Sequence, residues 1–108
     1  MKTYYLALDL KNDPVLIKQY ENLHQKIWPE KARSIKDSGI LQMKIYRVAN
    51  RLFMIIEAND DFSFDRKRSL DEGNPKVKEW EDLTWHYQQA LPDSVAGEKW
   101  RPMDLHLI

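Results

Sequence analysis

Segments with strand-like and helix-like periodicity follow one another in this chain in the order strand, helix, strand, strand, helix, strand. The strands are expected at residues 3–10, 40–48, 51–58 and 100–108, and the helices at residues 14–36 and 75–91, with a small helical insertion between residues 62 and 73. Chains of this order usually form an antiparallel four-stranded sheet with both helices on one face. The 108 residues are therefore expected to form a single domain of the α+β class, residues 1–108, with a modest core.

Caps and prolines mark the expected helix boundaries. Asp13 is placed to cap the first helix, with Pro14 at its first helical position, and Gly39 is expected to end it in the left-handed conformation. Pro29 lies within this helix and has no N–H, so either the helix kinks there or a second helix begins at Pro29. The charged run at residues 65–68 is expected to be a solvated helical turn or loop.

The predicted sheet is apolar on both faces. The strand at residues 51–58 is apolar up to Glu57, so it is expected to be the most buried strand. The face away from the helices would leave a large apolar patch on a small monomer, and such patches associate. The pattern therefore predicts a homodimer.

Tyr20, His24 and Trp28 are spaced four residues apart in the first predicted helix, so they form one row on its surface. The row combines a phenol, an imidazole that titrates near neutral pH and a flat indole. His24 lies at the edge of the helix's apolar stripe, where an imidazole can face a pocket. In the alternative interpretation Tyr20 and Trp28 are core residues and His24 forms only a structural hydrogen bond.

This row belongs to a longer motif that resembles the first helix of the L-rhamnose mutarotase family. The motif reads Tyr20, His24, Ile27, Trp28, Pro29, Glu30, and the resemblance continues through Ser38-Gly39, Ile45-Tyr46, Leu52-Phe53 and Glu57 over nearly the whole chain. Residues 74–100, with Glu79-Trp80-Glu81 and Gly97-Glu98-Lys99-Trp100, are more similar to a branch of the family associated with L-fucose.

The resemblance implies an enzyme without a cofactor that interconverts the α and β anomers of a 6-deoxy-L-hexose, L-fucose or L-rhamnose. It also implies a homodimer of ferredoxin-like subunits forming a dimeric α/β barrel. The family tyrosine matched by Tyr20 binds the sugar, and the histidine matched by His24 is the proton donor. His24 is therefore the expected catalytic residue, because ring opening and closing need only groups that exchange protons near neutral pH.

The aromatic residues expected around the sugar depart from the family pattern. Met43 stands where the family has a sugar-contacting tyrosine, and Tyr46 points to the opposite face of that strand. An adjacent tryptophan pair of the family's last helix is replaced by Trp80 and Trp85, of which Trp80 is the first candidate for stacking. With Tyr20 and Trp28, these residues form the expected sugar-binding set, and its changes favour L-fucose over L-rhamnose.

Glu57 has two alternative roles. A carboxylate in an apolar strand needs a partner or solvent, so Glu57 either contacts sugar hydroxyls or forms an ion pair with Arg47 or Arg51. His86 and His106 have no neighbouring ligand-like residues, so no metal site is expected.

The composition excludes several other classes of protein. The formal net charge is zero, which gives no electrostatic basis for binding nucleic acid or an anionic membrane. The absence of cysteine excludes disulfides, thiolate zinc sites and cysteine nucleophiles. No secretion signal or membrane-spanning run is recognisable, so a cytoplasmic location is expected. With glycines only at positions 39, 73 and 97, the chain has no phosphate-binding loop.

Two other functions fit the same pattern. One is a sugar-binding module that binds these sugars without catalysis. The other is a small dimeric-barrel monooxygenase or haem-handling protein, because that architecture hosts several activities and fold alone does not separate them.

Overall fold

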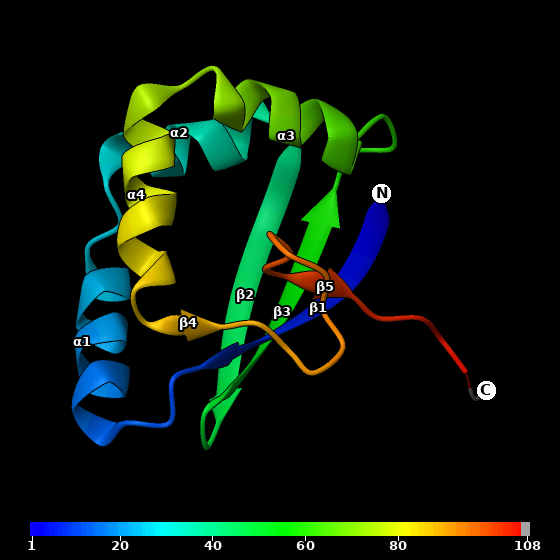
Figure 1. The fold of residues 1–108 in the computed structure, drawn as a ribbon. Coiled ribbons are helices and arrows are strands. Elements are labelled where there is room, and N and C mark those ends of the chain that lie inside the picture. Colours follow the sequence, from blue (N-terminus) through cyan, green and yellow to red (C-terminus); the bar gives the residue numbers. More distant parts are fainter. Residues whose placement is uncertain (107–108) are drawn as a thin grey trace.

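Three long strands form the centre of the structure. The computed structural model describes residues 1–106 (Figure 1). Its elements follow in the order β1 (Lys2–Leu10), α1 (Pro14–Gln25), α2 (Pro29–Asp37), β2 (Ile40–Val48), β3 (Arg51–Ala58), α3 (Phe64–Glu72), α4 (Pro75–Trp85), β4 (Gln88–Gln89) and β5 (Arg101–Pro102).

The strands form one antiparallel sheet. They lie in the order β2, β3, β1, β4, and β5 also pairs with β1. Leu6 of β1 lies opposite Met54 of β3, and Leu8 opposite Leu52, so the two strands present matched apolar side chains to the same face. Within residues 1–106 the sheet has five strands and the chain has four helices, which confirms the predicted α+β, ferredoxin-like fold.

The predicted helix starts are confirmed. The Asp13 carboxylate accepts hydrogen bonds from the N–H groups of Val15 and Leu16, and Pro14 is the first residue of α1. A second helix begins at Pro29. Of the two predicted alternatives, the start of a new helix is therefore correct and the kink is wrong. Gly39 follows α2 with φ of 97°, a left-handed conformation that glycine adopts at little cost.

The predicted end of the second main helix is wrong. It ends at Trp85 instead of residue 91. The N–H of Tyr87 donates to the Thr84 carbonyl and closes the last turn, and the Tyr87 carbonyl accepts from the N–H of Lys11 at 2.9 Å. Pairing with the chain after β1 therefore takes the place of a further helical turn.

The last strand lies within the predicted residues 100–108 but covers only Arg101–Pro102, and the short strand at Gln88–Gln89 is not predicted from the sequence. Two short strands, β4 and β5, pair with the edge of β1 that faces away from β3. Gln88 lies opposite Leu10, and Pro102 lies opposite Leu6. Pro102 has no N–H to donate, which limits the pairing of β5. Residues 107 and 108 lie outside the described part of the chain.

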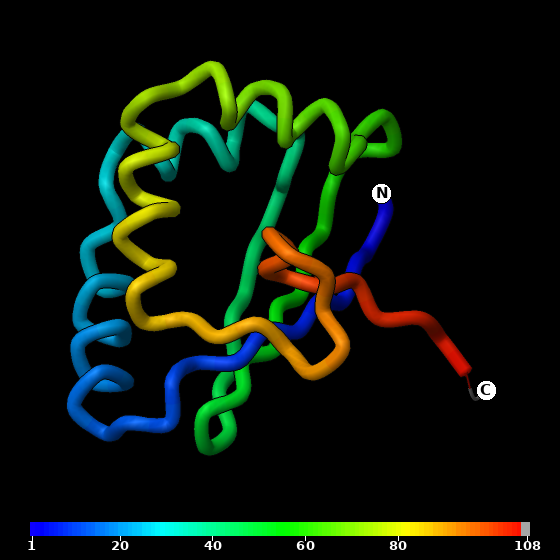
Figure 2. Tube along the Cα trace, in the orientation of Figure 1, coloured from blue at the N-terminus to red at the C-terminus, as the bar shows by residue number. Residues whose placement is uncertain are grey.

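The segment of residues 90–100, here called the return segment, connects β4 to β5 and is drawn in orange in Figure 2. The Arg101 guanidinium donates to the Pro92 carbonyl at 3.0 Å, which ties the two ends of the segment together. Trp100 packs against both buried clusters of the core. The return segment thus covers part of the same sheet face as the helices.

The charged run at residues 65–68 lies in α3, a regular helix of nine residues. The Arg66 guanidinium donates to the Ser38 carbonyl at 3.2 Å. The Lys67 side chain is only 16% exposed and pairs with Asp71 one turn later. The prediction of a solvated turn or loop is therefore correct for part of the run and wrong for Lys67.

The two faces of the sheet differ in what covers them. One face carries the core, which includes Leu6, Leu8, Leu10, Leu52, Met54 and Ile56, and the helices pack on this side (Figure 1). The other face, here called the open face, carries Tyr5, Tyr46, Val48, Phe53 and Ile55. On it Tyr46 is 51% exposed and Val48 74% exposed.

Within residues 1–106, every helix is too short or too polar to span a bilayer.

Candidate active site

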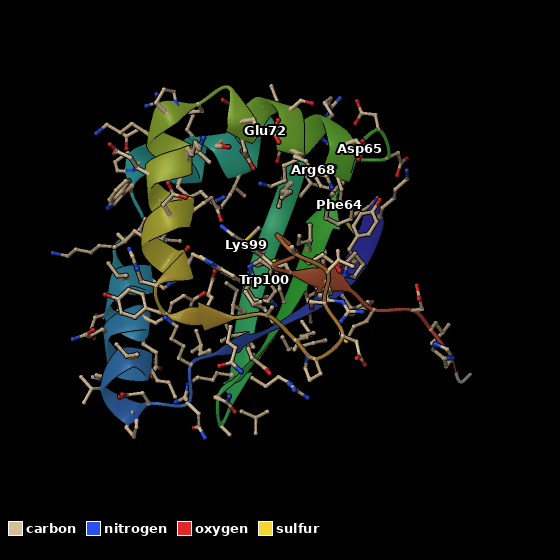
Figure 3. All side chains as sticks on the ribbon, in the orientation of Figure 1. Phe64, Asp65, Arg68, Glu72, Lys99 and Trp100 are labelled. Carbon is tan, nitrogen blue, oxygen red and sulfur yellow. The ribbon has the colours of Figure 1, made fainter. Side chains whose placement is uncertain are left out.

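A cleft of about 800 Å³ lies between the core side of the sheet and the helices. Leu6, Met43, Met54 and Ile56 line it from the sheet, and every helix and the return segment contribute further residues. Figure 3 labels Arg68 and Glu72 on α3 and Lys99 and Trp100 near β5, and these four residues line the cleft from two separate parts of the chain. A volume in this range is typical of small-molecule sites.

His24 lies in the last turn of α1 and lines the cleft. Its ring nitrogen Nδ1 lies 3.1 Å from the backbone carbonyl oxygen of Tyr20. A carbonyl oxygen only accepts, so Nδ1 carries a proton and donates it to this bond. In the neutral imidazole the lone pair is then on Nε2, for which residues 1–106 provide no hydrogen-bond partner.

Burial lowers the pKa of His24 below its usual value of 6.5, because a half-buried ring loses hydration of its charged form. The hydrogen bond to the Tyr20 carbonyl and the charge of Glu81 act in the opposite direction, and the charge of Lys31 adds to the lowering. The neutral, proton-accepting form is therefore the resting form of His24 at neutral pH.

Tyr20 is 3% exposed and packs between α1 and the sheet, next to Leu10 and Leu52. Its ring lies 4.3 Å from that of His24, measured between centroids. Burial raises the pKa of Tyr20 to about 12, so its hydroxyl keeps its proton at neutral pH. The hydroxyl is 3.3 Å from the side-chain nitrogen of Gln88.

Trp80 and Trp28 extend this aromatic cluster. The Trp80 ring meets His24 edge-on at 5.5 Å and Trp28 at 5.4 Å. Trp80 lines the cleft but is only 3% exposed, so most of its ring is packed against protein. Trp28 contacts Trp80 and does not line the cleft. Trp100 of the return segment is a further aromatic residue of the cleft wall, and no stacking role is predicted for it from the sequence.

The other sugar-binding candidates are placed differently. Met43 lines the cleft from β2. Trp85 is 37% exposed at the end of α4, outside the cleft lining, with the Lys99 ammonium 5.3 Å from its ring centre. Glu57 alternates with Ile56 along β3 and so lies on the opposite face from the cleft.

The predicted ion pair of Glu57 with Arg47 or Arg51 is wrong. Arg47 pairs with Glu21, and Arg51 pairs with Asp9 at 2.7 Å. Among residues 1–106, no ion pair involves Glu57.

A group of charged side chains also lines the cleft. The Lys31 ammonium lies 2.6 Å from the Glu81 carboxylate, and Lys99 lies 3.8 Å from the same carboxylate. Lys31 is not predicted from the sequence, because it lies on α2, beyond the break before Pro29, where the helical spacing of the motif no longer applies. Gln88 is also missed, because residue 88 falls within the predicted helix at residues 75–91.

Within residues 1–106, no group of three or more His, Cys, Asp or Glu side chains could hold a metal ion.

The fold and the cleft define a class of protein: a ferredoxin-like α+β chain with a histidine in a cleft between sheet and helices. The L-rhamnose mutarotase from Formosa agariphila has this fold, with a TM-score of 0.73 and 21% identity over 100% of this chain and 98% of that one. Tetracenomycin F2 cyclase from Streptomyces glaucescens is also similar, with a TM-score of 0.67 and 12% identity over 100% of this chain and 98% of that one. At these identities the likeness concerns the fold alone.

The family follows from the sequence matches. The family model described as L-rhamnose mutarotase matches residues 3–105, and the chain belongs to the L-rhamnose mutarotase family. The chain is 40% identical to an L-fucose mutarotase of Xanthomonas campestris, over 94% of this chain and 82% of that protein. It is 32% identical to an L-rhamnose mutarotase of Phocaeicola vulgatus, over 75% and 76% respectively. The predicted family is thus confirmed, and with it an isomerase-type sugar enzyme.

Proposed function

We propose that this protein is a mutarotase that interconverts the α and β anomers of a 6-deoxy-L-hexose, with His24 as its acid/base residue. The observation that carries the proposal is the fixed tautomer of His24 in the cleft. Nδ1 is held by the Tyr20 carbonyl at 3.1 Å, which leaves Nε2 available to a sugar oxygen. The lowered pKa keeps that nitrogen unprotonated at neutral pH.

In the proposed mechanism Nε2 of His24 accepts the proton of the anomeric hydroxyl as the bond between the anomeric carbon and the ring oxygen breaks. The imidazolium then gives that proton to the ring oxygen, which yields the open aldehyde. Rotation about the bond next to the aldehyde exposes its other face, and the reverse transfers close the ring to the other anomer. Each proton removed is returned, so the histidine ends each cycle neutral.

The remaining cleft residues suit a deoxy sugar. Met43 and Trp100 offer apolar surface for the methyl group and the ring hydrogens, and Trp80 adds the small part of its ring that reaches the cleft. The Lys31 ammonium and the Glu81 carboxylate, 2.6 Å apart, both offer charged partners for hydroxyl groups.

L-fucose is the substrate that the relatives and the aromatic set favour. The relative described as an L-fucose mutarotase is 40% identical, against 32% for the L-rhamnose mutarotase of Phocaeicola vulgatus. We expect saturation-transfer NMR of anomer exchange to show the largest acceleration with L-fucose, a smaller one with L-rhamnose, and little with the corresponding D-sugars. The matched control is the uncatalysed exchange of each sugar in the same buffer.

This experiment, together with a binding measurement and an absorbance spectrum of the purified protein, separates the alternative functions. Faster exchange of L-rhamnose contradicts the assignment of L-fucose but keeps the reaction. Sugar binding without accelerated exchange supports the non-catalytic sugar-binding module. An absorbance spectrum with a haem band in the purified protein supports the haem-handling alternative.

We also propose that two copies associate through the open face into a dimeric barrel. Tyr5 stacks on Phe53 at 6.0 Å, and Tyr46 lies 6.4 Å from Phe53, so aromatic surface is gathered in the middle of this face. The solved structure of a dimeric ferredoxin-like protein from an uncultured marine organism shares the fold, with a TM-score of 0.54. A second copy would remove this apolar surface from water.

We expect sedimentation equilibrium to show a dimer at micromolar concentration that persists at high salt, because an apolar interface is little screened. Tyr46→Asp should shift the protein toward monomer, since it places a charge within the interface. Val15→Asp, an equally drastic change at an exposed position in the first turn of α1, is the control and should leave the dimer intact. A stable wild-type monomer contradicts the proposal.

A further inference from the structure

Gln88 is a buried polar residue to which neither the motif nor the proposed mechanism gives a role. It lies on β4, where its backbone is held opposite Leu10 of β1. Its side chain is 5% exposed and lines the cleft. Burying an amide group costs free energy unless its polar atoms form hydrogen bonds.

Only half of the Gln88 amide is paired. Nε2 lies 3.3 Å from the Tyr20 hydroxyl, whereas Oε1 has no hydrogen-bond partner within residues 1–106. A buried acceptor left unpaired costs on the order of 1–3 kcal/mol. Because Gln88 lines the cleft, its unpaired acceptor points to a hydrogen-bond donor that arrives with the ligand.

The same conclusion holds for either orientation of the amide. If Nε2 donates to the Tyr20 oxygen, the tyrosine proton and Oε1 remain free. If the amide is turned over, the tyrosine donates to Oε1, and the NH₂ group and a lone pair of the tyrosine oxygen remain free. Each arrangement leaves at least one donor and at least one acceptor. A sugar hydroxyl, which both donates and accepts, can use both at once.

The pair is also close to the acid/base residue. The Tyr20 ring, which carries one half of the pair, lies 4.3 Å from the His24 ring. We propose that Gln88 binds a substrate hydroxyl jointly with Tyr20 and so fixes which sugar oxygens meet His24. This inference rests on the proposed function, and it adds a residue that selects and positions the sugar.

The test combines a substitution with a change in the sugar. Gln88→Met keeps the length of the side chain but removes its hydrogen bonds, and we expect it to weaken L-fucose binding by about 3- to 10-fold, the effect of one neutral hydrogen bond. The same substitution at Gln89, the exposed neighbour on β4, is the control and should have no effect. Binding is measured by calorimetry and exchange by NMR.

A series of L-fucose analogues, each lacking one hydroxyl, then identifies the contact. The wild type should lose about 3- to 10-fold in affinity for one analogue, and Gln88→Met should bind that analogue and L-fucose equally. If the variant stays sensitive to every hydroxyl as the wild type is, or loses only thermal stability, the inference is wrong. If Gln88→Met does not fold, a wild type equally tolerant of all the analogues overturns it, and Gln88→Glu provides the second variant.

This design also separates the inference from the function on which it rests. A wild type that binds sugars without accelerating anomer exchange overturns the proposed mutarotase, while the analogue series still tests Gln88. Normal exchange without coupling between residue 88 and any hydroxyl overturns only the role of Gln88.

Discussion

Replacing His24 with alanine should slow catalysed anomer exchange by about 10²- to 10⁴-fold, the usual contribution of a positioned acid/base group. Sugar affinity should change much less, because the aromatic and charged walls of the cleft remain. His106→Ala removes an exposed imidazole and is the matched control, with an unchanged rate expected. Saturation-transfer NMR under identical conditions measures all three proteins.

The pH profile gives a second test of the same residue. Because burial lowers the pKa of His24, wild-type exchange should fall as the pH decreases through a midpoint below 6.5. The contribution of His24 to stability has the same sign. An unfolded chain binds a proton at this residue below pH 6.5 while the folded chain resists it, so stability is full above 6.5 and is lost as the pH falls through the lowered pKa. A folded His24→Ala protein with undiminished exchange would end the catalytic assignment.

Replacing Trp80 with alanine should lower the free energy of unfolding by about 3–5 kcal/mol. The ring is 3% exposed and contacts both His24 and Trp28, so its removal leaves a cavity between α1 and α4 that the surroundings fill only in part. Urea denaturation followed by circular dichroism measures the change, with the slope of the transition checked for constancy.

Trp85→Ala, the same substitution one helical turn and a half further along α4, is the control. Trp85 is 37% exposed and its ring faces the Lys99 ammonium, so we expect a loss of about 1 kcal/mol or less. Equal losses for the two tryptophans would show that Trp80 is not the central packing residue of the cleft wall.

Much of the fold follows from local sequence signals. Local signals predict the strands of the central sheet, the Asp13 cap with Pro14 at the first helical position, and the left-handed Gly39, and all are confirmed. The end of α4 and the split fourth strand depend instead on pairing between residues near position 88 and β1. Such pairing joins parts of the chain that lie far apart in sequence, so helical periodicity alone extends the helix too far.

The candidate site also combines contacts that local spacing predicts with contacts between distant parts of the chain. Tyr20 and His24 share a helix, and their spacing alone brings them together. Gln88 reaches Tyr20 from 68 positions away, so no local pattern predicts that contact. Glu57 is a predicted candidate for sugar contact, but the two-residue alternation of β3 places it on the face opposite Met54 and Ile56, away from the cleft. This local signal is present in the sequence, and the prediction overlooks it.

The hydrogen bond that sets the tautomer of His24 comes from the peptide backbone at residue 20 and not from a side chain. A carbonyl group is present whatever amino acid occupies a position, so no single substitution that preserves α1 can delete it. Mutations can therefore alter the shape of the cleft and the sugar it accepts while the same nitrogen keeps the proton. The chemistry of this site is inherited with the helix, which leaves its specificity free to diverge.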